Sequence, residues 1–350
     1  MPTSSRHLCQ QPIMVQQRGR HLVVDIHAHM NVAAAETALR EALPDLPQGL
    51  PFSCPASDAV NMRMFRQIGS RLNGVTERIE DMDRLGIDVQ ALSPNPGQYY
   101  YFTPPELGRD LSRTINDGLA QAVGQAPDRL VGIGTVPLQH PEMAIEEMTR
   151  AVRDCGMRGI EIGTNIGGKE LSDPAYRPFF AAAEDLGVLL FMHPLGFTHG
   201  ERLSDHYLNN LIGNPLESTI ALSHLIFGGV LDSCPDLKLC VAHGGGYLPA
   251  YRGRMDHAFH AREDCRKPIT RAPSTYLDQV WFDSLVFDRK QLEFLVATYG
   301  ADRICMGSDY PFDMGEADPV GFLDEIDEAS REQILGRNAA RLLNLAATQP

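Results

Sequence analysis

Eight short apolar runs, most of them followed by a helical pattern, lie along this 350-residue chain, and this alternation constrains the fold most strongly. Near-continuous runs rich in Val, Ile and Leu are typical of parallel strands that are buried on both faces. Eight strands in this repeated strand–helix alternation predict an α/β fold of the (β/α)8 barrel type rather than an open doubly wound sheet. The predicted strands are Leu22–His27, Val89–Ser93, Leu130–Val136, Gly159–Gly163, Val188–His193, Leu237–His243, Val280–Leu285 and Arg303–Gly307.

The segments between these runs set the domain organisation. Residues 31–75 are Pro-rich and weakly periodic, and we expect them to be an insertion after the first strand, over the mouth of the barrel. Residues 1–20 are expected to be an N-terminal tail, and residues 21–350 a single barrel domain. The predicted helices are Thr76–Leu85, Leu107–Ala126, Pro141–Cys155, Pro174–Leu186, Pro215–Leu231, Asp288–Tyr299 and Arg331–Leu343.

Composition excludes several classes of partner. The formal net charge of −14 argues against nucleic acid and anionic membrane surfaces, because either partner requires a basic face. No apolar stretch approaches the roughly 18–20 residues of a membrane span. The seven cysteines are widely spaced and form no Cys-x-x-Cys motif, which predicts reduced thiols in a cytoplasmic protein.

Four histidines and one aspartate stand at the ends of predicted strands. His27 and His29 end the first run and project from one face of it, because side chains alternate along a strand. Two converging neutral imidazoles suit a divalent metal such as zinc. His193 and His243 end the fifth and sixth runs, and Asp309 follows the eighth. Barrel active sites form at the C-terminal ends of the strands, so these five residues predict a metal enzyme.

Several motifs extend this pattern from Val24 to about Leu345. They are Asp25-Ile26-His27-Ala28-His29, Arg78-Ile79-Glu80-Asp81-Met82-Asp83, Val136-Pro137-Leu138-Gln139, His193-Pro194, His243-Gly244-Gly245-Gly246 and Gly307-Ser308-Asp309-Tyr310-Pro311-Phe312. With these motifs the chain resembles the amidohydrolase superfamily. Within it, the chain is similar to the branch typified by 2-amino-3-carboxymuconate-6-semialdehyde decarboxylase.

The resemblance implies roles for the strand-end residues. It implies one divalent metal ion, usually zinc with manganese as the alternative, in a site that keeps a position open for water or substrate. It also implies that His243 is the acid–base residue close to the metal but not a ligand, and that Asp309 shares in proton transfer. The implied metal ligands are His27, His29, His193 and Asp309.

Two further carboxylates have open roles. Dinuclear relatives bridge two metals with a carboxylated lysine from the fourth strand, where this chain carries no lysine. Glu161 of that strand can bridge in principle, but we expect one metal. Asp25 precedes the histidine pair by two residues and shares their predicted strand face. It either supports the metal ligands or is a barrel carboxylate paired elsewhere.

The resemblance also indicates residues that face the substrate. Arg66 stands twelve residues before Arg78, where the family places an arginine that grips a substrate carboxylate. Arg254, eleven residues after His243, matches an arginine contributed across a dimer interface, which implies a homodimer or larger homo-oligomer. A surface arginine and a structural salt bridge are the alternatives. The aromatic run 99–102 is either a wall of the barrel mouth or ordinary loop packing.

The activity that the resemblance implies is non-oxidative decarboxylation of a small aromatic or muconate-like carboxylic acid. In this interpretation the metal polarises the substrate or activates a bound water, and His243 acts as acid or base. One alternative is a metal-dependent hydrolase or hydratase on the same scaffold, which cleaves a C–C or ester-like bond or adds water to an unsaturated dicarboxylate. A second alternative is a non-catalytic metal-binding protein.

Overall fold

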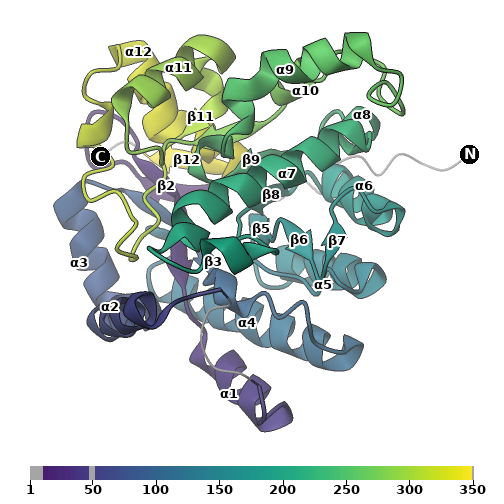
Figure 1. Ribbon diagram of the computed structural model, residues 1–350. Coiled ribbons are helices and arrows are strands. Elements are labelled where there is room, and N and C mark those ends of the chain that lie inside the picture. Colours follow the sequence, from purple (N-terminus) through teal and green to yellow (C-terminus); the bar gives the residue numbers. More distant parts are fainter. Residues whose placement is uncertain (1–10, 47–51, 349–350) are drawn as a thin grey trace, which may run out of the picture.

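The computed structural model describes residues 11–46 and 52–348, which contain an eight-stranded parallel sheet rolled into a nearly closed barrel (Figure 1). The strands follow one another around the barrel in chain order, as expected when each strand is followed by a crossover helix. This arrangement confirms the predicted (β/α)8 barrel. The strands are β2 (Val24–Met30), β3 (Val89–Pro94), β4 (Leu130–Gly134), β5 (Gly159–Ile162), β8 (Leu189–Met192), β9 (Leu239–Val241), β10 (Trp281–Asp283) and β11 (Ile304–Cys305).

The seam of the barrel lies between β2 and the segment that follows β11. The backbone N–H of Asp309 donates to the carbonyl of His27 at 2.8 Å, and the N–H of His29 donates to the carbonyl of Tyr310 at 2.8 Å. Residues 306–310 therefore act as the continuation of the last strand. This seam holds Asp309 directly against the histidine pair, although the two lie 280 residues apart in the sequence.

A bulge in β2 changes which residues face the barrel interior. Asp25 pairs with Gln90 and Ala28 with Leu92, so β2 uses one more residue than β3 over this stretch. An extra residue shifts the alternation of side chains along a strand. The Asp25 carboxylate accepts hydrogen bonds from the side chains of Gln90 at 2.9 Å and Ser308 at 2.6 Å, away from the imidazoles. The expectation that Asp25 shares the face of the two histidines is therefore wrong.

Helices cover the outside of the barrel (Figure 1). α3 has the predicted bounds, and the predicted helix Pro215–Leu231 divides in two at Gly229, whose φ of 73° is left-handed. α9 was not predicted. The helices are α1 (Ala33–Ala42), α2 (Pro55–Asn73), α3 (Thr76–Leu85), α4 (Pro105–Gln125), α5 (Pro141–Arg153), α6 (Arg177–Leu186), α7 (Asn214–Phe227), α8 (Val230–Ser233), α9 (Leu248–Ala261), α10 (Ser274–Leu277), α11 (Arg289–Tyr299), α12 (Glu328–Glu332) and α13 (Asn338–Leu343).

The segment 31–75 contains two of these helices. α1 packs against α4, whereas α2 buries Met64, Ile68 and Leu72 in a small apolar cluster with Phe312. Residues 47–51 of this segment lie outside the described part of the chain. α2 is the helix that reaches the strand ends where the histidines lie.

The first and last strands of the described chain pair with each other beside the barrel. β1 (Ile13–Gln16) pairs in parallel with β12 (Leu345–Thr348) in a separate two-stranded sheet. Residues 13–16 are therefore not part of a tail, because Val15 is buried in the same apolar cluster as the strands of the barrel. A second small sheet joins β6 (Asn165–Ile166) to β7 (Lys169–Glu170).

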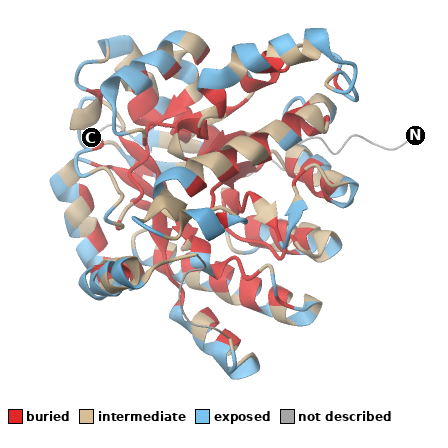
Figure 2. Cartoon of the chain, in the orientation of Figure 1, coloured by how far each residue is buried: buried red, intermediate tan, exposed pale blue. Residues whose placement is uncertain are grey.

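The core has two layers. One apolar cluster includes Ile26, Val89, Phe191 and Cys240 from the barrel strands, and a larger one fills the space between the strands and the helices. Figure 2 shows buried residues along the strands and on the inner sides of the helices. Within the described ranges, no helix combines the length and apolar character that crossing a membrane requires.

Candidate metal centre

Four of the predicted residues form one buried group at the ends of the strands. Each offers one ligand atom, and these atoms all lie within 4.8 Å of one another. His29 Nε2 lies 3.1 Å from His27 Nε2 and 3.2 Å from Asp309 Oδ1. Ligand atoms about 2.0–2.1 Å from a tetrahedral zinc ion lie about 3.3–3.4 Å apart, so these separations suit a single cation. The group consists of His27, His29, His193 and Asp309.

Hydrogen bonds on the far side of two rings orient their lone pairs toward the centre of the group. His27 Nδ1 lies 2.6 Å from Asp283 Oδ2, and His29 Nδ1 lies 3.0 Å from the carbonyl oxygen of Pro94. Both partners accept hydrogen bonds, so when the two rings are neutral both Nδ1 atoms carry the proton and both Nε2 atoms carry a lone pair. Two lone pairs that face each other at 3.1 Å repel unless a proton or a metal cation lies between them.

His193 completes this arrangement. It is buried, and neither of its ring nitrogens has a hydrogen-bond partner within the described part of the chain. A buried imidazole without a partner is costly unless it coordinates a metal. The donor set therefore fits a divalent metal ion.

The charges of the group favour a cation as well. Burial lowers the pKa of His27, but the charge of Asp309 and the hydrogen bond to Asp283 outweigh burial and raise it to about 10. Burial and the neighbouring histidines hold the pKa of His193 well below its usual value. Burial opposes ionisation of Asp309, yet the His27 charge and the hydrogen bonds from the histidines hold its pKa well below the usual range. A proton on His27 thus stands where the positive charge of a metal would act.

His243 borders this group without belonging to it. Its Nε2 lies 3.9 Å from Asp309 Oδ2, and its ring centroid lies 4.9 Å from that of His193. The backbone is left-handed at both His243, with φ of 57°, and Asp309, with φ of 60°. Side chains other than glycine rarely adopt this conformation, and it clusters at functional sites.

The structure also brings in residues that sequence reasoning missed or used differently. Asp283, a lone carboxylate inside the apolar run of β10, supports His27, and its position in that run was the available clue. Arg78 is fully buried and donates to the carbonyl of His29 at 2.7 Å. Its guanidinium also lies 4.8 Å from the ring centroid of Tyr310. Arg78 therefore contacts both sides of the barrel seam, His29 on β2 and Tyr310 on the opposite segment.

Glu161 lies beside the group but not in it. Its Oε1 is 3.7 Å from His29 Nδ1, the nitrogen that faces away from the ligand cluster, and accepts a hydrogen bond from Ser93 at 3.2 Å. Burial raises the pKa of Glu161 well above its usual value. Within the described residues, this carboxylate does not join the group of potential metal ligands.

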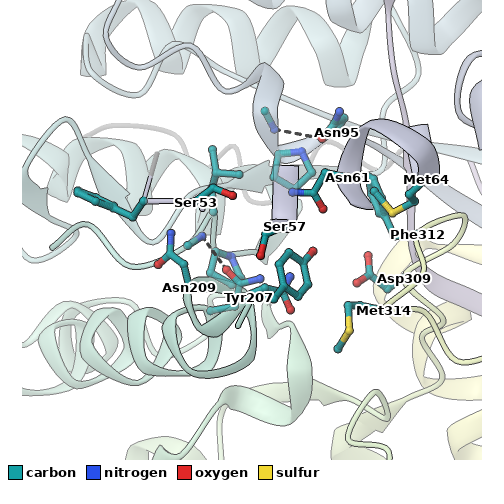
Figure 3. A pocket seen from close by; sticks show the side chains of 18 of the residues that line it. Ser53, Ser57, Asn61, Met64, Asn95, Tyr207, Asn209, Asp309, Phe312 and Met314 are labelled. Carbon is teal, nitrogen blue, oxygen red and sulfur yellow. Dashed lines mark hydrogen bonds between the residues drawn. The ribbon is translucent and has the colours of Figure 1, made fainter. Parts of the chain in front are cut away.

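A cavity of about 220 Å³ opens above the metal ligands. Figure 3 shows Asp309 at one side of it, Ser57 and Asn61 from α2 at another, and Tyr207 with Asn209 opposite α2. Its walls combine apolar side chains such as Phe312 with neutral polar groups. No lysine or arginine among the described residues lines it.

A second cavity of about 270 Å³ lies on the His243 side. Asp309, Asn210 and Met314 line both cavities, so the two spaces meet over the ligand cluster. Asp309 therefore borders both spaces, and His243 lines the second of them.

The predicted arginines and aromatic run lie outside these walls. Arg66 on α2 and Arg254 on α9 are both exposed, and neither lines a described cavity. Tyr99 is buried and donates to the carbonyl of His193 at 3.1 Å, and its ring stacks on Tyr101 at 5.4 Å. Loop packing therefore accounts for Tyr99 and Tyr101, whereas Phe102 is exposed, and no residue of the run 99–102 lines either described cavity.

Comparisons with known proteins agree with this geometry. The family profile described as amidohydrolase matches residues 24–345. The 2-amino-3-carboxymuconate-6-semialdehyde decarboxylase of Dictyostelium discoideum is 36% identical over 340 residues, which cover 93% of this chain and 92% of that protein.

Solved structures share the same fold. The 5-carboxyvanillate decarboxylase LigW from Sphingomonas paucimobilis superposes with a TM-score of 0.83 at 25% identity, over 93% of this chain and 99% of that one. A 5-carboxyvanillate decarboxylase from Novosphingobium aromaticivorans, a mutant form solved with bound manganese, superposes with a TM-score of 0.82 at 25% identity. That superposition covers 95% of this chain and 100% of the other.

Proposed function

Because the chain belongs to the amidohydrolase family, we propose that it is a metal-dependent decarboxylase of an aromatic or muconate-like carboxylic acid. The observation that carries the proposal is the buried group of three imidazoles and one carboxylate, with His243 at its rim. The named activities of the Dictyostelium and Sphingomonas proteins support decarboxylation as the reaction. They do not favour the hydrolase or hydratase alternative.

His27, His29, His193 and Asp309 would hold the metal ion in this proposal. A divalent cation bound there supplies positive charge that neutralises the substrate's anionic oxygen atoms beside the reacting carbon. We propose zinc, because three imidazoles and one carboxylate are ligands that zinc commonly takes. Manganese stays the alternative, since the Novosphingobium structure carries it.

His243 and Asp309 manage the proton. Loss of CO2 replaces a C–C bond by a C–H bond, so the reaction consumes one proton and needs no oxidant or reductant. We assign the proton donor to His243, whose ring borders the second cavity and faces Asp309 at 3.9 Å. As the proton adds to carbon, the electron pair of the C–CO2 bond stays with the remaining molecule and CO2 leaves.

Arg66 and Arg254 keep their proposed role in holding a substrate carboxylate. No arginine of the described chain lines the cavity. To hold a substrate carboxylate there, an arginine must therefore reach the cavity by side-chain movement or from a second copy. Arg66 follows Phe65, which does line the cavity, and a rotation of its long side chain is the first route. Arg254 lies on the exposed side of α9 beside the exposed Tyr251, and an interface between two copies is the second route.

The remaining expectations belong to the same proposal. We propose a homodimer or larger homo-oligomer in the cytoplasm, built from one barrel domain over residues 21–350 that β1 (Ile13–Gln16) joins, with residues 31–75 partly over its mouth. The described cysteines are all free, which supports a reducing compartment. The residues of α2 that line the cavity support the position of the insertion.

The test is product analysis with metal-loaded protein and a panel of hydroxybenzoic and muconate-type acids. We expect release of CO2, one solvent deuteron on the carbon that loses it in D2O, and no solvent oxygen in the product. Incorporation of oxygen from labelled water, without CO2, would instead establish a hydrolase or hydratase.

A further inference from the structure

Asp283 contacts both halves of the proposed machinery. It is the last residue of β10 and is fully buried. Its Oδ2 accepts the hydrogen bond from His27 Nδ1 at 2.6 Å, and its Oδ1 accepts one from the backbone N–H of Gly244 at 2.8 Å. Oδ1 also accepts from the N–H of Leu285 at 3.3 Å. One carboxylate therefore joins a metal ligand to the residue that follows His243.

The contact with His27 fixes which ring nitrogen of His27 carries the proton. A carboxylate accepts hydrogen bonds and donates none, so His27 Nδ1 must carry the proton and Nε2 must present its lone pair. Partners of this kind fix the orientation and basicity of histidines that bind metals. Without Asp283, the proton can move to Nε2 and block coordination.

The contact with the backbone N–H of Gly244 fixes the orientation of the His243 side chain. The His243 ring has no anchor of its own on one side, because its Nδ1 is buried without a hydrogen-bond partner within the described residues. The backbone therefore carries the orientation, and it is left-handed at both His243 and Gly244, with φ of 57° and 61°. The hydrogen bond from Gly244 to Asp283 holds the chain in this conformation.

The last strand packs closely against Asp283 and His27. A Cβ atom added to Gly307 would lie 3.1 Å from the Cβ of Asp283 and 2.9 Å from the Cβ of His27. Only glycine at this position lets the last strand approach both side chains so closely.

We propose that Asp283 is a positioning residue that couples the metal ligand His27 to the acid–base residue His243 through its two carboxylate oxygens. The part that concerns His243 rests on the proposed function, whereas the part that concerns His27 does not.

Asp283→Asn and Asp283→Ala test the coupling through two readouts, the dissociation constant for Zn²⁺ or Mn²⁺ without substrate and kcat at saturating metal. An amide has one acceptor oxygen, so Asp283→Asn keeps an acceptor either for His27 Nδ1 or for the N–H groups of Gly244 and Leu285, and it must weaken metal binding or lower kcat. Asp283→Ala satisfies neither, and we expect metal affinity about 10–100-fold lower, together with lower kcat at saturating metal and little change in KM.

Glu147→Gln is the matched control, because Glu147 is also a buried carboxylate, bonded to Asn116 and two arginines away from the site. We expect it to lower Tm and leave both readouts unchanged. Wild-type metal affinity and kcat in folded Asp283→Asn would overturn the proposal, even if Asp283→Ala fails to fold. If no acid is decarboxylated, the metal affinities of the Asp283 variants still test whether the contact with His27 supports metal binding.

Discussion

The metal-ligand group at the bottom of the site, called the floor below, and the side chains around the cavity, called the walls, are built differently. The metal-ligand group lies on strand ends and the barrel seam, is buried, and has its rings oriented by Asp283 and Pro94. The walls of the cavity come from α2 and from connecting segments around Tyr207 and Phe312, and several of their side chains are partly exposed. In our proposal the strand ends hold the metal ion, whereas the segments between the strands contact the substrate.

The largest effect is expected where floor and wall meet. Replacing His243 with Ala should lower kcat by about 10²–10⁴-fold, because the positioned proton donor is lost while all four metal ligands remain. Metal content and circular dichroism should match the wild type. His260→Ala, which removes an exposed histidine of α9, is the control and should keep full activity. Loss of metal from the His243 variant would make His243 a ligand and would contradict the division of roles.

The arginines test whether the walls extend to a second copy. Removing Arg66 or Arg254 should lower kcat/KM for an acid substrate by about 10–100-fold, since a hydrogen bond to a charged group contributes about 1.5–3 kcal/mol. Metal affinity should not change. If Arg254 acts across an interface, mixing Arg254→Ala chains with His243→Ala chains should restore part of the activity. A fully active monomer would refute the shared site.

Metal binding at the floor should release a proton, whereas changes in the walls should not affect this release. The pKa of His27 is raised to about 10 in the metal-free protein, so its ring is protonated at pH 7. A coordinating imidazole must be neutral, and metal binding therefore releases this proton. Affinity should rise about tenfold per pH unit from pH 7 and level off as pH approaches the His27 pKa. Calorimetry in buffers of different ionisation enthalpy measures the proton count, and zero protons released at pH 7 would disprove the linkage.

The smallest effect is expected in the walls alone. Asn61 of α2 is largely buried and lines the cavity. Asn61→Ala should raise KM by about 2–10-fold, as expected for one neutral hydrogen bond, with kcat and metal affinity nearly unchanged. Gln67→Ala, an exposed residue of the same helix, should change none of these parameters. A drop in metal affinity for Asn61→Ala would show that floor and walls are not separable.

This difference also explains what the sequence could predict. Burial and strand periodicity predict the apolar runs and place the residues at their ends together, so the barrel and the gathering of His27, His29, His193, His243 and Asp309 were predictable. That His243 is not a ligand was implied only by the family resemblance. The bulge that turns Asp25 away was not, because an extra residue in one strand is visible only once its partner is aligned.

The contributions of distant segments were also hidden. Asp283 interrupts an apolar run, but its contact with His27 arises only when the barrel closes. α2 lies in a weakly periodic segment, so its cavity-lining face gave no clear pattern.

The most direct test of the account is the metal content of the chain. Protein purified without chelators, or stripped and reloaded with Zn²⁺ or Mn²⁺, should hold about one equivalent per chain, and His29→Ala should lose both metal and activity. One equivalent that tracks with activity agrees with a single site formed by three histidines and Asp309. Two equivalents, with Glu161 as a bridge, or full activity in metal-free protein, would contradict it.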